Sequence, residues 1–264
     1  MAIFLGETKM KVSAIMCIWN EIRFLPLKIK WCKLNGIEPY IIDNFSDDGS
    51  WEWLQDNNIP SHRFDTDGAF HLSKNVKEMT KTLHKIKPDW AIYIDADDFI
   101  SFDEGIGETI KQADRNGYNC ISCPLITFYN TGESSFELSD PFDPFNSYFY
   151  LRGGTTKTQI MISKYCRDMN FRPERIRRSR EKSFKVNGAK FNYGPSKGKE
   201  NRVAVFERRQ KAWDQGLPKG LGIHYKIFTQ NDWVWNTEDC EDIRNYPKVY
   251  KYLIKIQDQM GDSD

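Results

Sequence analysis

The chain has 264 residues, of which 39% are hydrophobic and 28% charged, and its formal net charge is +1. This profile is typical of one large globular domain, and it excludes a membrane-spanning protein because no apolar run approaches the roughly 20 residues that a span needs. The opening MAIFLGETKMK lacks the layout of a signal peptide, and six scattered cysteines do not form a disulfide framework, so we expect a cytoplasmic protein.

Strand and helix patterns alternate along the first 130 residues. Residues 12–18 are a nearly continuous apolar run, typical of a strand covered on both faces. Residues 21–35 carry apolar side chains at a helical spacing, and Gly36 ends that helix. Further strands are predicted at 39–42, 61–64, 90–94 and 119–128, and further helices at 51–57, 72–86 and 104–116. This order predicts an α/β fold, with a mainly parallel, Rossmann-like sheet flanked by helices.

Polar clusters follow three of these predicted strands. The clusters are WNE at 19–21, DNFSDDGS at 43–50 and DADD at 95–98. Because ligands of open α/β sheets bind beyond the carboxyl ends of the strands, these clusters predict a nucleotide-type site. The cysteines of the single CxxC, Cys120 and Cys123, lie inside a strand pattern, so we interpret them as buried thiols and not as zinc ligands.

Asp95 and Asp97 form a DxD directly after a strand. Two carboxylates at this spacing can hold one hard cation, Mg²⁺ or Mn²⁺, which in turn binds a diphosphate. The alternative is that these aspartates cap a helix or populate a turn. The strand before them and the polar strand ends beside them favour the cation site.

The second half of the chain differs in charge and in pattern. Residues 131–150 read as a long loop over the site, and residues 164–211 are basic. The net charge is −9 for residues 1–150, +14 for 151–230 and −4 for 231–264. We therefore divide the single domain into a core at 1–130 and an irregular acceptor region with a tail at 131–264. The basic segment suits a polyanion, although the two halves could instead neutralise each other across an internal interface.

Together these motifs resemble one protein family. The order of CIWNE, a helix, YIIDNFSDDGS and WAIYIDADDFI is similar to the family-two glycosyltransferases of the GT-A fold, over about the first 105 residues. The resemblance is to the subgroup with NE, D-N-x-S-x-D-G and DADEF motifs, and His224 in GIHYKIF is a further match. Asp98 departs from the Glu that is more usual in this subgroup, which leaves the DxD intact.

The resemblance implies a role for each matching residue. Asn20 and Glu21 would lie near the nucleoside, and Asp43 would contact the base, with Asp48 shaping the turn beside it. Asp95 would touch ribose or metal. Asp97 would be the principal metal ligand, and His224 a late ligand to metal or diphosphate. Glu21 and Asp48 could instead cap the helices that follow them.

Inverting sugar transfer also needs a carboxylate base beyond the DxD. The candidates for this base are Glu133, Glu137, Asp140 and Asp143. Acceptor binding is assigned to the basic side chains Arg172, Arg175, Arg177, Arg178 and Lys182. The sequence does not decide between inversion and retention.

We therefore expect a metal-dependent hexosyl- or pentosyltransferase that uses a nucleotide-sugar, with UDP as the expected carrier, and a hydroxyl acceptor. Because of its charge, the basic segment favours duplex DNA with a hydroxylated base, as in the base glycosylation of phage DNA. A surface or lipid-linked glycan is the alternative acceptor. A non-catalytic nucleic-acid-binding protein is the rival class, and a nucleotidyltransferase is disfavoured because CIWNEIRF lacks a glycine-rich, Lys/Arg-bearing loop.

Overall fold

A computed structural model describes residues 4–5, 8–127, 150–152, 158–172, 175–193, 198–216 and 240–261. Its centre is a nine-stranded sheet in the order β5-β4-β3-β6-β10-β8-β14-β7, with β13 paired to β8. The strands are β3 (Val12–Ile18), β4 (Glu38–Asp43), β5 (Ser61–Arg63), β6 (Trp90–Tyr93), β7 (Asp98–Phe102), β8 (Cys120–Thr127), β10 (Thr158–Lys164), β13 (Ser183–Lys185) and β14 (Gly188–Asn192).

Most strands of this sheet are parallel. Strands β5, β4, β3 and β6 pair in parallel, and β13 and β14 are parallel to β8. Strand β10 runs antiparallel between β6 and β8, and β7 runs antiparallel beside β14. The predicted fold class, a mainly parallel α/β sheet flanked by helices, is confirmed.

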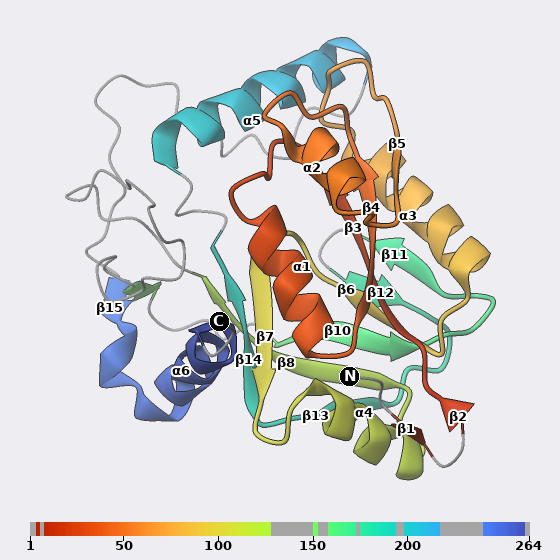
Figure 1. Cartoon of the computed structure of the whole chain (residues 1–264), viewed down its shortest axis with the longest axis vertical. Helices are drawn as coiled ribbons and strands as arrows, with labels where there is room; N and C mark the ends of the chain where they lie inside the picture. Colours follow the sequence, from red (N-terminus) through yellow and green to blue (C-terminus); the bar gives the residue numbers. More distant parts are fainter. Residues whose placement is uncertain are drawn as a thin grey trace.

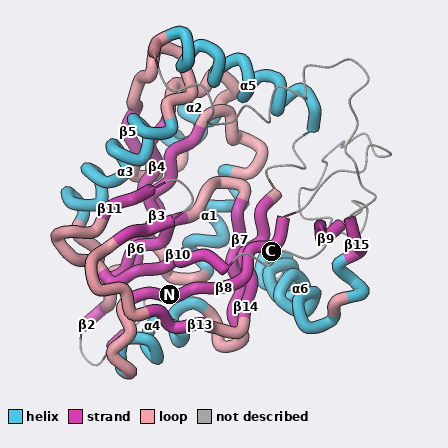
Figure 2. The backbone as a smooth tube through the Cα atoms, turned by 180° about the vertical axis from the view of Figure 1, so that it is seen from behind, coloured by secondary structure: helices cyan, strands magenta, loops and turns pink. Residues whose placement is uncertain are grey.

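Helices cover both faces of the sheet. They are α1 (Leu25–Leu34), α2 (Ser50–Asp56), α3 (Leu72–Ile86), α4 (Ile106–Arg115), α5 (Gly198–Asp214) and α6 (Pro247–Gly261), with a short 3₁₀ helix at Ile243–Asn245. Helix α1 lies in front of the strands in Figure 1 and behind them in Figure 2. Right-handed crossovers place helices on both faces. The connections through α1 (β3 to β4) and α2 (β4 to β5) run in one direction along the sheet, and the connection through α3 (β5 to β6) runs in the other.

The elements predicted for the first 130 residues are present with shifted ends, and three of the strands described in this part of the chain were not predicted. Strand β7 begins inside the DADD cluster, at Asp98, and was not predicted. Helix α1 begins only at Leu25, with Pro26 in its first turn, where a missing N–H costs nothing. Cys120 and Cys123 are free and buried in β8, as expected of strand thiols.

The second half of the chain completes this sheet, because β10 and β14 insert among strands of the first half. Strand β14 can pair with β7 only because it starts with glycine. A Cβ on Gly188 would lie 2.3 Å from the Phe102 ring and 2.5 Å from the Ser101 carbonyl oxygen. The basic segment, predicted to be irregular, therefore supplies a core strand.

Shorter strands form three two-stranded sheets outside this one. They pair β1 (Phe4–Leu5) with β2 (Thr8–Lys9), β11 (Asn170–Arg172) with β12 (Arg175–Arg177), and β9 (Tyr150–Arg152) with β15 (Cys240–Asp242). Across the described part of the chain, no helix is both long and apolar enough to cross a bilayer.

Candidate active site

The three polar clusters meet at one edge of the sheet. Strands β3, β4 and β6 are parallel neighbours, and the Cα register pairs Ile18 with Asp43 and Ile15 with Tyr93. Their carboxyl ends therefore lie side by side, and the residues that follow each strand share that edge. The sequence prediction of a common strand-end site is consistent with this topology.

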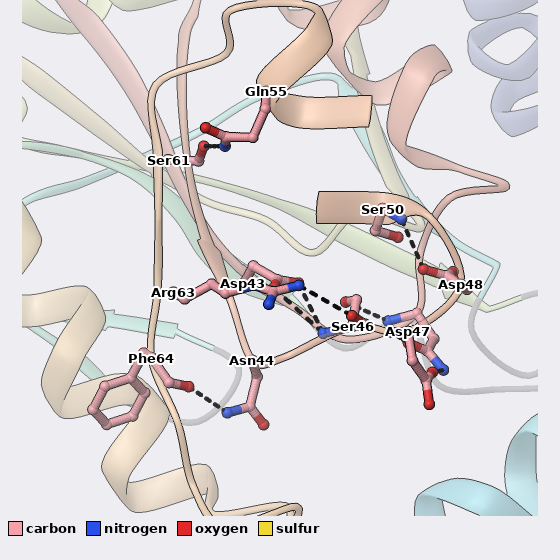
Figure 3. A network of polar contacts seen from close by, with 11 residues as sticks. Asp43, Asn44, Ser46, Asp47, Asp48, Ser50, Gln55, Ser61, Arg63 and Phe64 are labelled. Carbon is pink, nitrogen blue, oxygen red and sulfur yellow. Dashed lines mark hydrogen bonds and ion pairs between the residues drawn. The ribbon is translucent and has the colours of Figure 1, made fainter. Parts of the chain in front are cut away.

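The turn after β4, residues 43–50, is held by its own side chains. The carboxylate of Asp43 is fully buried and accepts the backbone N–H of Ser46 at 3.2 and 3.3 Å. Figure 3 shows the Arg63 side chain reaching from β5 to the same carboxylate, with Nε at 3.1 Å from Oδ2. Asp43 is thus an internal anchor of the turn, and its contact with a nucleotide base remains a prediction.

Asn20 and Asp48 tie this turn to the segment after β3. Asn20 donates its side-chain amide to Asp47 at 2.7 Å and accepts the Asp47 backbone N–H at 3.0 Å. Asp48 accepts the backbone N–H groups of Ile22 and Ser50, each at 3.0 Å. Asp48 thereby joins the start of α2 to the segment after β3, while the N-cap residue of α2 is Gly49. The backbone N–H of Glu21 donates to the Ser50 hydroxyl at 3.0 Å.

Arg63 is one site residue that sequence reasoning missed. Its guanidinium lies 4.8 Å from the ring centres of both Phe45 and Trp51, in addition to its ion pair with Asp43. Arg63 is the last residue of β5, and the register of the β4–β5 pair sets it opposite Asp43. Its position at the end of a predicted strand was the one signal in the sequence that could have identified it.

The turn after β6, residues 95–98, is held from outside. The Asp98 carboxylate is fully buried, and its Oδ2 lies 2.6 Å from Nζ of Lys190, which is 4% exposed. Its Oδ1 accepts the side-chain amide of Asn192 at 2.7 Å, and Oδ2 also accepts the Asp95 backbone N–H at 3.1 Å. The ammonium group of Lys28, buried in α1, donates to the Asp98 carbonyl oxygen.

Both lysines are affected by burial, in different ways. Burial lowers the pKa of Lys28 to about 8. Burial also opposes the charge of Lys190, but the carboxylates of Asp98, Asp95 and Asp97 outweigh it and leave the pKa of Lys190 above its ordinary value. Lys190 is therefore charged at neutral pH.

Asp95, Asp97 and Asp98 are the one group of described residues whose ligand atoms could jointly hold a metal ion, with carboxylate oxygens within 4.8 Å of one another. Carboxylate oxygens fit Mg²⁺ or Mn²⁺. Asp98 already has a cation and two N–H donors, so its oxygens are occupied. The two aspartates of the predicted cation site lie beside it: Asp95 is half-buried and Asp97 is 7% exposed.

Helix α5 adds a second residue that sequence reasoning missed. The Arg208 guanidinium lies 4.1 Å from the Trp19 ring centre and donates to the side chain of Asn44 and, at 3.2 Å, to the carbonyl oxygen of Gly68. Burial lowers the pKa of Arg208 to about 10, so it keeps its charge at neutral pH. Arg208 thereby fastens the second half of the chain to the ends of β3 and β4.

The basic side chains assigned to the acceptor do not gather around the strand-end site. Arg178 donates to the carbonyl oxygens of Asn119 and Lys164, and the Lys182 backbone N–H donates to the Asn119 side chain. Asn119 precedes β8, and Lys164 pairs with Trp90, the first residue of β6. These contacts place both basic residues at the amino ends of the parallel strands.

The other predicted residues lie elsewhere. Arg172 and Arg177 are exposed residues of the β11–β12 hairpin, whose Phe171 and Ile176 are buried, and only the backbone of Arg175 is described. His224 and the candidate bases Glu133, Glu137, Asp140 and Asp143 lie outside the described residues.

Comparison with known proteins adds a family. Residues 13–172, more than half of the chain, match the family model described as Glycosyl transferase family 2. No curated protein sequence matches the chain.

Several solved structures are similar at low identity. S. aureus TarS 1–349 is 13% identical over 83% of this chain and 70% of that one, with a TM-score of 0.38. Its complex with UDP-GlcNAc is 16% identical over 47% and 36% of the two chains, with a TM-score of 0.33. Glucosyl-3-phosphoglycerate synthase from Mycobacterium tuberculosis, in complex with phosphoglyceric acid, is 14% identical over 49% and 47%, with a TM-score of 0.30.

In the last two of these structures the likeness spans less than half of the neighbour's chain. Since the three TM-scores lie below 0.5, the functional assignment comes from the family match and from the site geometry.

Proposed function

The chain belongs to glycosyl transferase family 2 and is a glycosyltransferase, and on that premise we propose that it transfers a sugar from a UDP-linked donor to a hydroxyl acceptor with the help of a divalent cation. The observation that carries this proposal is the Asp95–Asp98 turn. It presents Asp95 and Asp97 at the carboxyl edge of the sheet while Asp98 is retained inside. Donors of α/β enzymes bind at this edge.

Asp95 and Asp97 would hold Mg²⁺ or Mn²⁺. The cation would supply charge compensation for the departing nucleoside diphosphate. The protein fixes the backbone from which the two carboxylates project: Asp98 accepts the Asp95 backbone N–H, and the Tyr193 backbone N–H donates to the Asp97 carbonyl oxygen. Two rigidly placed carboxylates require less reorganisation when the donor binds.

The nucleoside would lie over the ends of β3 and β4, near Asn20, Glu21 and Asp43. In the structure the Asp43 carboxylate is enclosed by Arg63 and Ser46. A base recognised through Asp43 would therefore have to contact this group of three residues where it borders the site. If this recognition selects uracil, UDP should raise the melting temperature more than GDP at equal concentration with Mn²⁺ present. Equal shifts would remove the uridine assignment and leave the transferase assignment intact.

The base that deprotonates the acceptor hydroxyl is proposed among Asp140, Asp143 and Glu133, and His224 is proposed as a further cation ligand. These roles come from the family resemblance and from the position of the residues after the DxD in the sequence. Neutralising each carboxylate in turn, and following kcat against pH, would identify the base, because the essential residue alone should abolish the acid limb of the profile.

The test of the proposed function is release of UDP from a panel of UDP-sugars. Release should require Mn²⁺ or Mg²⁺, stop on chelation with EDTA and resume when the cation is restored. The same panel with GDP- and dTDP-sugars is the matched control. Turnover that is unchanged after complete chelation would overturn the cation-dependent part of the proposal.

Duplex DNA with hydroxylated bases is our proposed acceptor, and a glycan is the alternative. The +14 charge of residues 151–230 favours DNA. Arg178 and Lys182 lie at the amino ends of the strands, opposite the proposed donor site. DNA that reaches the donor site would therefore have to contact other basic residues, such as Arg172 of the β11–β12 hairpin.

DNA binding should therefore weaken linearly in log affinity against log salt, and Arg172→Glu should reduce it more than Lys182→Glu does. Absence of DNA binding at low salt would favour the glycan.

A further inference from the structure

Strand β14 reaches the Asp95–Asp98 turn with three successive polar contacts. Lys190 contributes its ammonium group to Asp98 Oδ2, Asn192 its amide to Asp98 Oδ1, and Tyr193 its backbone N–H to the Asp97 carbonyl oxygen at 2.9 Å. The turn is therefore fixed on the side of β14 by residues that the family resemblance, limited to about the first 105 residues, does not cover.

The contact between Lys190 and Asp98 decides whether the Asp98 carboxylate can act as a ligand of a cation. Asp98 lies within the same 4.8 Å group as Asp95 and Asp97, so by position alone it could be a third ligand. Its ion pair of 2.6 Å with a buried lysine, together with two N–H donors, engages both oxygens. Breaking such a buried pair is costly, so Asp98 stays inside the protein.

The charge of Lys190 also acts on the two remaining carboxylates. Charges interact strongly over the short distances of a buried cluster, where little water screens them. A fixed ammonium group beside Asp95, Asp97 and Asp98 therefore opposes the approach of a free divalent cation. A cation that arrives with an anionic diphosphate faces less repulsion, because the complex carries little net charge.

We propose that Lys190 is a positioning residue that keeps Asp98 out of the cation's ligand set and weakens the binding of free Mn²⁺, so that the cation binds together with the donor. This inference rests on the proposed function of Asp95 and Asp97 and deepens it. Lys190 acts through Asp98 and through its charge, and it does not touch the reacting atoms.

The experiment measures Mn²⁺ affinity by calorimetry, with and without UDP, in the native protein and four variants. Lys190→Met should tighten binding of Mn²⁺ alone at least about tenfold and reduce the gain in affinity that UDP provides. Lys190→Arg keeps the charge and should stay close to native. A purely structural lysine would give the opposite result for Lys190→Met, namely weaker binding from a loosened turn.

A second pair of variants guards against misfolding, because Lys190→Met leaves a buried carboxylate without its cation. Asp98→Asn removes that carboxylate, and the double variant with Lys190→Met then differs from Asp98→Asn only in the lysine. The double variant should bind Mn²⁺ alone at least about tenfold more tightly than Asp98→Asn.

If native protein binds Mn²⁺ in the presence of UDP but the two Asp98→Asn proteins bind Mn²⁺ alone with equal affinity, the inference is overturned. The proposed function would then still stand. Native protein that binds no Mn²⁺ even with UDP would overturn the cation site itself and this inference with it.

Discussion

The two acidic turns at the carboxyl edge of the sheet are held in different ways. Residues 43–50 are fastened mainly by bonds within the turn and to the neighbouring ends of β3 and β5, as Ser46, Asn20 and Arg63 show, and Arg208 of α5 adds a bond to Asn44. Residues 95–98 depend on Lys28 in α1 and on β14, where Asn192 lies 94 positions beyond Asp98. The two turns are similar in composition, but only the turn at residues 95–98 depends on a strand from the second half of the chain.

This difference also separates the roles of the aspartates. In the first turn the buried carboxylate of Asp43 is bonded to Ser46 within the turn and to Arg63 on the neighbouring strand β5. In the second, Lys190 and Asn192 hold the Asp98 carboxylate inside the protein, and Asp95 and Asp97 belong with it to the group of carboxylates that could hold a cation. The turn that is anchored by a strand of the completed sheet is the one whose carboxylates suit a metal ion.

The largest expected effect is on turnover, from Asp97→Asn. The substitution is nearly isosteric but removes a charged ligand of the proposed cation, so turnover should fall by about 10² to 10⁴-fold, with a near-native melting temperature. Asp103→Asn is the matched control, since Asp103 is exposed and pairs with Lys251 at 2.6 Å. Native turnover by Asp97→Asn at saturating Mn²⁺ and donor would contradict the role of Asp97.

The next effect compares the turns directly through one substitution in each. Asp98→Ala leaves the buried Lys190 unpaired and should lower the free energy of unfolding by about 3–5 kcal/mol. Asp48→Ala loses two bonds to partly exposed backbone N–H groups and should lower it by about 1–2 kcal/mol. Urea denaturation measures both, and equal losses would remove the distinction between the turns.

Lys28 gives a pH-dependent test of the second turn. Its amine titrates at about 8 when folded and at its ordinary value of 10.5 when unfolded, so the unfolded state binds more protons between these pH values. Stability should therefore rise by about 3 kcal/mol from pH 8 to pH 10.5, relative to a Lys28→Met variant that lacks this amine. Parallel stability curves for the two proteins would show that Lys28 does not titrate in this window.

The smallest effect belongs to the first turn. Asn20 has a φ of 54°, a conformation that asparagine tolerates better than alanine does, and it exchanges two bonds with Asp47. Asn20→Ala should cost about 1–2 kcal/mol of unfolding free energy, and Asn20→Gly should cost less because glycine removes the backbone strain. A larger loss for glycine than for alanine would mean that backbone strain is not a factor.

Sequence patterns were sufficient for the first half of the fold. The apolar run at 12–18 and the helical spacing at 21–35 and 72–86 correspond to β3, α1 and α3, because burial of one face or stripe is encoded in residues that are close in the chain. The DxD and the polar strand ends could be placed on one edge for the same reason. Strand β7 was missed because it starts inside an acidic cluster, where periodicity carries no signal.

What only the tertiary structure decided is how each charged residue is used. No local pattern shows that Lys190 pairs with Asp98, that Arg63 encloses Asp43, or that Arg178 lies at the amino ends of the strands. These pairings depend on the order of strands in the sheet, above all on β14 lying between β8 and β7. A charge is neutralised by whatever lies within a few ångströms in space, and for these residues those neighbours are distant in the chain.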